Sequence, residues 1–182
     1  MRDGLGPVGR FALVMLATVG ALRALDRVPA LLTGATHGTR LFETLDEAEL
    51  ALGVKLWLPS YYPDALSWPP ARIEADRTAP LVAIRIEGRA RGEEHAVICQ
   101  SLEGDGCGES SFRQLLPRAE EVGAVQIDVG GRPASLKRLV TPGGGIVHDL
   151  FWVQGGRSLA MRYHGPAPDL LRMAASMGRA QR

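Results

Sequence analysis

The chain has 182 residues, of which 46% are hydrophobic, so it can bury one sizeable core, and disorder over most of its length is excluded. Its 21 basic and 20 acidic residues give a net charge of +1. A chain this close to neutrality has no electrostatic field to attract nucleic acid, so nucleic acid is not expected among its partners.

An apolar run near the N-terminus predicts export. Basic residues precede the run FALVMLATVGAL, residues 11–22. About a dozen apolar residues match a signal-peptide core and fall short of the ~20 needed to span a bilayer. Cleavage after Ala21 would release a periplasmic protein, whereas continuation of the helix to Leu32 would retain the chain in the cell membrane. Residues 1–29 are therefore predicted to be a signal peptide or a single-pass anchor, with the C-terminal domain outside the cytoplasm.

A tether and a folded domain are predicted to follow. Residues 30–40 are small and rich in Gly and Thr, as is typical of a flexible tether, and residues 41–180 form the predicted extracytoplasmic domain. Thr44 and Glu47 have the spacing of a capping box, which opens a helix that ends at Gly53. The sequence VKLWLP then predicts a brief strand.

The segment from Pro59 to Pro70 combines four prolines with three aromatic residues. Proline is not tolerated in a central strand, so the segment is predicted to be an ordered loop or a sheet edge. Two interpretations remain open. In one, the rings pack back over the sheet as a cover; in the other, they form a partner-binding surface made of Tyr61, Tyr62 and Trp68.

The two cysteines lie in or just after the second strand of a predicted hairpin, residues 81–87 and 95–101. In an oxidising compartment Cys99 and Cys107 would form a disulfide; the alternative is a buried, unpaired Cys99. This spacing does not match a zinc site. The acidic residues of the following loop lack the ligand spacing of a calcium site, which predicts a solvated turn holding Glu103, Asp105 and Glu109.

The second half of the chain predicts more strands and a covering helix. A short helical turn is expected from Ser111 to Pro117, followed by strands at residues 125–129 and 134–140. Residues 146–153 are apolar on both sides, which indicates a central strand. After a Gly-Gly turn, the last strand presents one apolar face to a helix that starts near Pro168 and ends at Gly178; that face consists of Leu159, Met161 and Tyr163.

These patterns predict an α+β fold: a mostly antiparallel sheet, built as a meander of hairpins, with two principal helices and a preceding N-terminal apolar helix. The residues typical of catalysis are scattered. His37 lies in the tether, His95 begins a strand and His164 ends one, while His148 and Asp149 are adjacent and so point to opposite faces. We predict no catalytic residue, no metal site and no cofactor, and therefore no enzyme.

Three stretches of the chain form a recognisable set: FETLDEAELALGVKLWLPSYYPDAL, VQIDVGGRPASL and LFWVQGGRSLAMRYHGPAPDLLRMAASM. They resemble an exported bacterial family of unknown function, found in envelope proteins and in the outer part of membrane-bound anti-sigma factors. The general shape is similar to regions of lipoprotein-sorting and sigma-regulating periplasmic proteins. The resemblance covers most of residues 41–177 and implies an extracytoplasmic domain without catalytic residues. Only about ten residues precede the apolar run, so no sigma-binding region, and no direct anti-sigma activity, is expected.

The sequence therefore favours a non-catalytic envelope protein, membrane-tethered or periplasmic. It would act as an accessory subunit or sensor that docks on a membrane protein or membrane complex. The alternative is a periplasmic carrier or sensor of a lipid or other apolar ligand. A third hypothesis is an enzyme that uses His148 or His164.

Overall fold

The structure, a computed structural model, describes residues 39–179 except for 71, 77–79, 90–93 and 105. The predicted signal peptide or anchor, residues 1–29, lies outside the described residues, as do most of the predicted tether and the apolar helix expected there. Of the helices that are described, none is long and apolar enough to cross a membrane.

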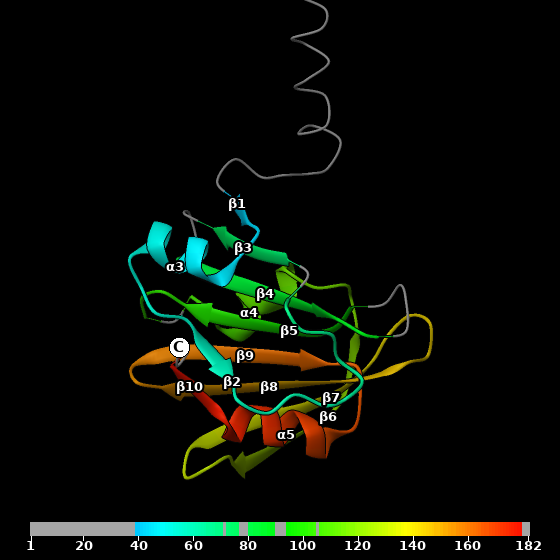
Figure 1. The fold of residues 1–182 in the computed structure, drawn as a ribbon. Helices are drawn as coiled ribbons and strands as arrows, with labels where there is room; N and C mark the ends of the chain where they lie inside the picture. Colours follow the sequence, from blue (N-terminus) through cyan, green and yellow to red (C-terminus); the bar gives the residue numbers. More distant parts are fainter. Residues whose placement is uncertain (1–38, 71, 77–79, 90–93, 105, 180–182) are drawn as a thin grey trace, which may run out of the picture. The chain divides into compact units, whose positions relative to one another are not determined.

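An eight-stranded antiparallel sheet dominates the described domain (Figure 1). Its strand order is β1-β3-β4-β5-β9-β8-β7-β6, and a small second sheet joins β2 to β10. The sheet-rich, mostly antiparallel fold with few helices is confirmed. The elements are β1 (Thr39–Phe42), α3 (Leu45–Leu52), β2 (Trp57–Pro59), β3 (Arg72–Asp76), β4 (Leu81–Glu87), β5 (Glu94–Ser101), α4 (Glu109–Gln114), β6 (Glu120–Asp128), β7 (Pro133–Val140), β8 (Ile146–Gln154), β9 (Arg157–Tyr163), α5 (Ala167–Ala175) and β10 (Met177–Arg179).

The sheet is not one continuous meander, because β5 pairs with β9 and not with β6. After β5 the chain forms α4, reaches the far edge at β6 and returns through β7 and β8 to the centre. The central position of β8, between β7 and β9, is as predicted. Local alternation predicts hairpins but carries no information on which hairpins meet, so the junction of β5 with β9 could not be predicted from it.

Helix α3 has the predicted caps. The Thr44 hydroxyl accepts a hydrogen bond from the Glu47 N–H at 3.2 Å, and Gly53 closes the helix in the left-handed conformation with φ +68°. The Glu47 carboxylate accepts from the N–H of Glu43, one residue before the cap, at 3.2 Å. The helix buries Ala48 against the main core.

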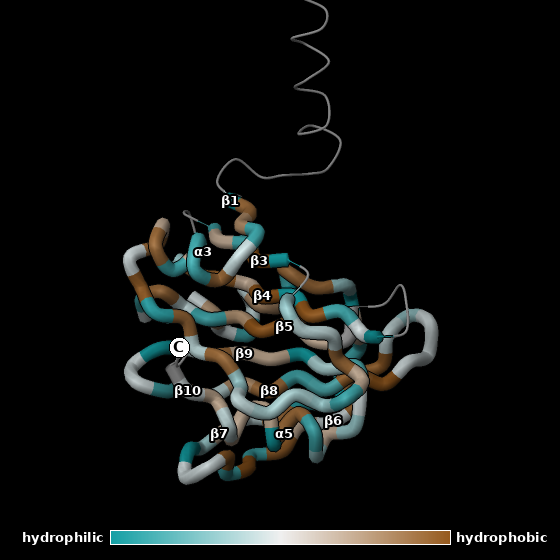
Figure 2. The backbone as a smooth tube through the Cα atoms, in the orientation of Figure 1, coloured by the Kyte–Doolittle hydropathy of each residue, from teal (hydrophilic) through white to brown (hydrophobic). Residues whose placement is uncertain are grey.

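Helix α5 covers one side of the sheet, which we call the α5 face. As predicted, Leu159, Met161 and Tyr163 of β9 are buried on this side together with residues of the helix. Hydrophobic positions recur along the central strands, while the turns are more hydrophilic (Figure 2). The α5 side chains that fill this core are Leu170, Met173 and Ala174.

Two helix boundaries differ from the prediction. Helix α5 ends at Ala175 instead of Gly178, because residues 177–179 form β10 and pair with β2. Helix α4 begins at Glu109, with Gly108 as its N-cap, and not at Ser111. At the end of α5 the pairing of β10 with β2 decides the boundary, and local capping signals do not report such a contact. The start of α4 differs from the prediction by two residues, which is the usual uncertainty of a helix end.

Helix α4 lies on the opposite side of the sheet, which we call the α4 face (Figure 1). Its Phe112 is fully buried and Leu116 follows just after it; both pack on Val97 and Ala160 of the central strands. The Phe112 ring meets the Phe151 ring edge-on, with centroids 5.5 Å apart. This cluster is much smaller than the one under α5, so the α4 face depends on other contacts as well.

Candidate interaction surface

The aromatic-proline segment, residues 59–70, is fixed to the domain at both ends. Near its start, the Tyr61 N–H donates to the Ser176 hydroxyl at 3.1 Å. Near its end, the Ser67 N–H donates to the Glu87 carbonyl at 2.9 Å. A segment held in this way presents its side chains in a defined arrangement.

Two of its aromatic residues belong to the core. Tyr61 is half-buried; its hydroxyl donates to Asp169 Oδ1 at 3.2 Å, and the Arg172 guanidinium lies 5.8 Å from its ring centroid. Tyr62 is also half-buried and packs on the main core. For these two tyrosines the interpretation as a cover over the sheet describes the structure.

The Tyr62 hydroxyl is buried and has no hydrogen-bond partner among the described residues. Burial raises the pKa of this phenol well above its usual range. The Tyr62 ring stacks at a tilt on Trp68, with ring centroids 4.7 Å apart. Trp68 itself is 47% exposed, so among the three predicted contact residues it is the one that faces solvent.

Cys99 and Cys107 are joined by a disulfide, and both are buried. Of the two alternatives open from the sequence, the structure has the disulfide. It connects β5 to the residues just before α4, which fixes the start of this short helix on the sheet. Beside it lies an open hollow of about 340 Å³, lined among others by Phe151 and Val153.

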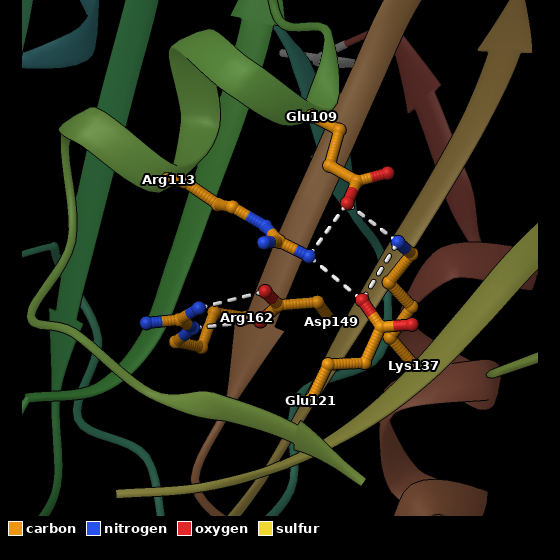
Figure 3. Close-up of polar contacts among 6 residues, drawn as sticks. All are labelled: Glu109, Arg113, Glu121, Lys137, Asp149 and Arg162. Carbon is orange, nitrogen blue, oxygen red and sulfur yellow. Dashed lines mark hydrogen bonds and ion pairs between the residues drawn. The ribbon is translucent and has the colours of Figure 1, made fainter. Parts of the chain in front are cut away.

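A buried ion pair lies at the centre of the α4 face (Figure 3). Arg162 of β9 and Asp149 of β8 lie at facing positions on neighbouring strands and form two hydrogen bonds, of 2.6 and 2.7 Å. Both side chains are almost fully buried. The Arg162 guanidinium also donates to the carbonyl of Pro117 at 3.0 Å, which ties the segment after α4 to the sheet.

A second, more exposed group of charges adjoins this pair. Lys137 of β7 contacts Glu109 at 2.5 Å and Glu121 at 3.0 Å, and Arg113 contacts the same two carboxylates at 2.6 and 2.7 Å (Figure 3). The hydrogen bond from Lys137 lowers the pKa of Glu121. Desolvation opposes the charge on Lys137, yet hydrogen bonds to both carboxylates raise its pKa.

The predicted solvated turn is therefore only partly correct. Glu103 is exposed, but Glu109 belongs to α4 and to this ion-pair group, and Asp105 lies outside the described residues. Within residues 39–179, apart from those left undescribed, the structure has no group of three acidic, His or Cys residues placed to hold a metal ion.

The structure describes the side chains of two of the histidines, His148 and His164. The Nδ1 of His148 lies 3.0 Å from the Gly165 carbonyl, on the face opposite Asp149. His164 is exposed and lines a hollow of about 470 Å³ with Arg162. His37 and the His95 side chain lie outside the described part of the chain.

The sequence interpretation missed the ion pairs, although a signal for one of them was present. Counting outward from the Gly155-Gly156 turn places Asp149 opposite Arg162. Opposite charges at facing strand positions predict a contact. The two partners of Lys137, Glu109 of α4 and Glu121 of β6, come from different elements and have no such local signal.

Neither a protein-family model nor a curated protein matches this chain. The resemblance of residues 41–177 to the exported envelope family therefore stays a prediction. What the described residues offer to a partner is a fixed, exposed Trp68, an open hollow beside the disulfide, and the sheet edge at β6.

Proposed function

We propose that this protein is an extracytoplasmic, non-catalytic binding module that docks on a membrane protein or membrane complex as an accessory subunit or sensor. Its N-terminal apolar segment would deliver it through the membrane or hold it there. The resemblance to the exported envelope family is consistent with this function.

The disulfide supports the export part of the proposal. Disulfides persist in oxidising compartments and are rare where thiols are kept reduced. Cys99 and Cys107 are joined and buried, and their bond closes a short loop that fixes α4. A protein that relied on this bond would be placed best outside the cytoplasm.

Trp68 is the observation that carries the docking part. Large aromatic residues dominate the energetics of protein interfaces, and a side chain that is ordered before binding loses less entropy on docking. Trp68 is 47% exposed, stacks on the half-buried Tyr62 and lies next to the fixed Ser67. Tyr61 and Tyr62 would support this surface from beneath, and Trp68 would make the contact.

The polar residues most typical of catalysis are engaged in contacts that hold the fold. Asp149 binds Arg162, and Glu109 and Glu121 bind Lys137. These contacts favour a structural role for the α4 face over a chemical one.

The test is extraction of native membranes in a gentle detergent, followed by sizing and mass spectrometry. Co-migration with a larger complex is expected, and Trp68→Ala should weaken docking by about 2 kcal/mol, or roughly thirtyfold in affinity. Leu50→Ala is the control. Leu50 is 86% exposed on α3, so this substitution removes an exposed apolar side chain away from the aromatic-proline segment. Recovery of the protein only as a free species, or equal docking of both variants, would contradict the proposal.

Carriage of an apolar ligand is the second candidate, and the hollow beside the disulfide is the observation that favours it. Phe151 and Val153 give it apolar walls, but Glu109 and Gln126 line it as well. A lipid that co-purifies with the protein in a fixed ratio, and is lost in Phe151→Ala, would favour this function over docking.

A further inference from the structure

Strand β6 forms a long, exposed edge of the sheet. It has nine residues, whereas β1, at the other edge, has four. Eight of its residues are exposed, and only Ile127 is half-buried. Since β7 pairs with one side of β6, about half of its N–H and C=O groups point away from the sheet. An edge of this length is a template for a further strand.

The charges of β6 follow a symmetric pattern. Its sequence is EEVGAVQID, with Glu120 and Glu121 at one end, Asp128 at the other and no charge between them. Lys137 and Arg113 already pair with Glu121, so the charges that a partner strand would meet are those of Glu120 and Asp128. In the middle, Val122 and Val125 are 54% and 53% exposed. The edge therefore offers an apolar centre between two acidic ends.

This pattern disfavours a second copy of the same chain that pairs along the whole length of β6. In an antiparallel pairing of two β6 strands centred on Ala124, Glu120 of each copy faces Asp128 of the other. In a parallel pairing in register, each acidic residue faces its own counterpart. Like charges at facing positions destabilise a strand pair, so both arrangements are unfavourable.

We propose that the β6 edge binds an extended segment of a partner protein as an added strand, and that this segment carries Lys or Arg at both ends and small or apolar residues between them. Opposite charges at facing positions stabilise a strand pair, and this charge arrangement fits β6 in either strand direction. The proposal goes beyond docking through Trp68 and does not require that surface.

The regular part of the edge locates the contact. The register between β6 and β7 shifts between Glu121 and Gly123 and is regular from Gly123 to Asp128. A bulge bends its strand and interrupts pairing, so we expect the backbone hydrogen bonds of the added strand along this regular part, with one basic end at Asp128 and the other reaching past the bulge to Glu120. On one face it lies next to Val125, which then loses much of its exposure.

Two synthetic peptides serve as probes for the full-length chain, purified in a mild detergent with its disulfide intact. One has alternating Thr and Val in the middle and two Lys at each end; the other has Glu in place of Lys. The basic peptide is expected to bind roughly tenfold more tightly than the acidic one. Hydrogen–deuterium exchange should slow at residues 123–128 when it binds.

Two proline variants test whether the backbone of β6 makes the contact. Successive N–H groups of a strand point in opposite directions, so one of Ala124→Pro and Val125→Pro removes an N–H that β7 uses and the other removes one that points outward. The first should lower Tm. The second should keep Tm close to that of the wild type and lose at least tenfold in affinity for the basic peptide.

A charge variant tests the recognition of the ends. Glu120→Lys should weaken the basic peptide by about threefold and strengthen the acidic one by a similar factor. Glu103→Lys is the control, because Glu103 is exposed, lies off β6 and gives the same change in net charge. It should leave both affinities unchanged.

Three results would overturn the inference: equal binding of the two peptides, protection outside β6, or protection of β6 that grows with protein concentration without peptide, which would indicate a second copy as occupant. An unchanged affinity for the basic peptide in the variant with the outward-facing proline would remove the β6 inference and leave the proposed function standing. If the protein binds the basic peptide at β6 but co-migrates with no membrane complex, the β6 inference stands and the proposed function is removed.

Discussion

The two faces of the sheet are covered in different ways. On the α5 face, Leu170 and Met173 bury a continuous apolar surface. On the α4 face, a six-residue helix contributes Phe112, and the rest of the cover is held by a disulfide and buried charges. Burial alone fixes a helix whose apolar face is large, whereas a short helix needs directional contacts to hold one position.

The contacts after α4 show this need. The first residues beyond the helix lack intrahelical partners for their carbonyls, and two arginines on the sheet supply them. Arg85 donates to the Leu115 carbonyl at 3.0 Å, and Arg162 donates to the Pro117 carbonyl at the same distance. The disulfide fixes the other end of the segment, so the α4 face should respond to single substitutions more sharply than its small core suggests.

The largest expected effect is at the buried ion pair. Asp149→Ala leaves the Arg162 charge buried without its carboxylate, and we expect a loss of about 3–5 kcal/mol in the free energy of unfolding, measured by urea titration. Asp149→Leu combined with Arg162→Met removes both charges and should recover at least half of the loss. If the double variant is as unstable as Asp149→Ala, the loss comes from packing and not from the unpaired charge.

The disulfide should have a smaller effect. Cys99 and Cys107 are eight positions apart, and closing a loop of this length stabilises by about 2.5 kcal/mol in the chain-entropy model. Cys99→Ser combined with Cys107→Ser should therefore lower stability by about that amount. Reduction of the wild type in urea should give the same loss, while the double variant should be insensitive to reductant. A wild type unaffected by reductant would show that the bond does not hold α4.

The sequence predicted those parts of the fold that depend on contacts between residues close together in the chain. Local signals predicted the caps of α3, the helix over Leu159 and Met161, and the central position of β8. The junction of β5 with β9, the strand β10 and the partners of Lys137 depend on contacts between distant segments, which periodicity does not encode. The exposure of Trp68, in contrast to Tyr62, also depends on packing that no local pattern reveals.

The smallest effect concerns a polar defect beside the apolar face. The Tyr62 hydroxyl is buried without a partner among the described residues, so Tyr62→Phe should stabilise the protein by about 1 kcal/mol near neutral pH. Burial raises the pKa of this phenol in the folded state. The folded state therefore favours the neutral form, and the stability that this provides is present below pH ~10, the pKa in the unfolded chain, and is lost as the pH rises further.

Thermal unfolding between pH 8 and 11 tests both the stabilisation by Tyr62→Phe and the loss of stability at high pH. The wild type should lose Tm above pH 10, and Tyr62→Phe should lose less, because the residual fall comes from groups such as Tyr163, whose pKa burial also raises. Tyr61→Phe is the control, and its effect on stability should have the opposite sign. The Tyr61 hydroxyl donates to Asp169, so its removal should lower the free energy of unfolding by about 1 kcal/mol. Equal losses of stability in Tyr62→Phe and Tyr61→Phe at neutral pH would contradict this prediction, because they would mean that the Tyr62 hydroxyl makes a stabilising contact as the Tyr61 hydroxyl does.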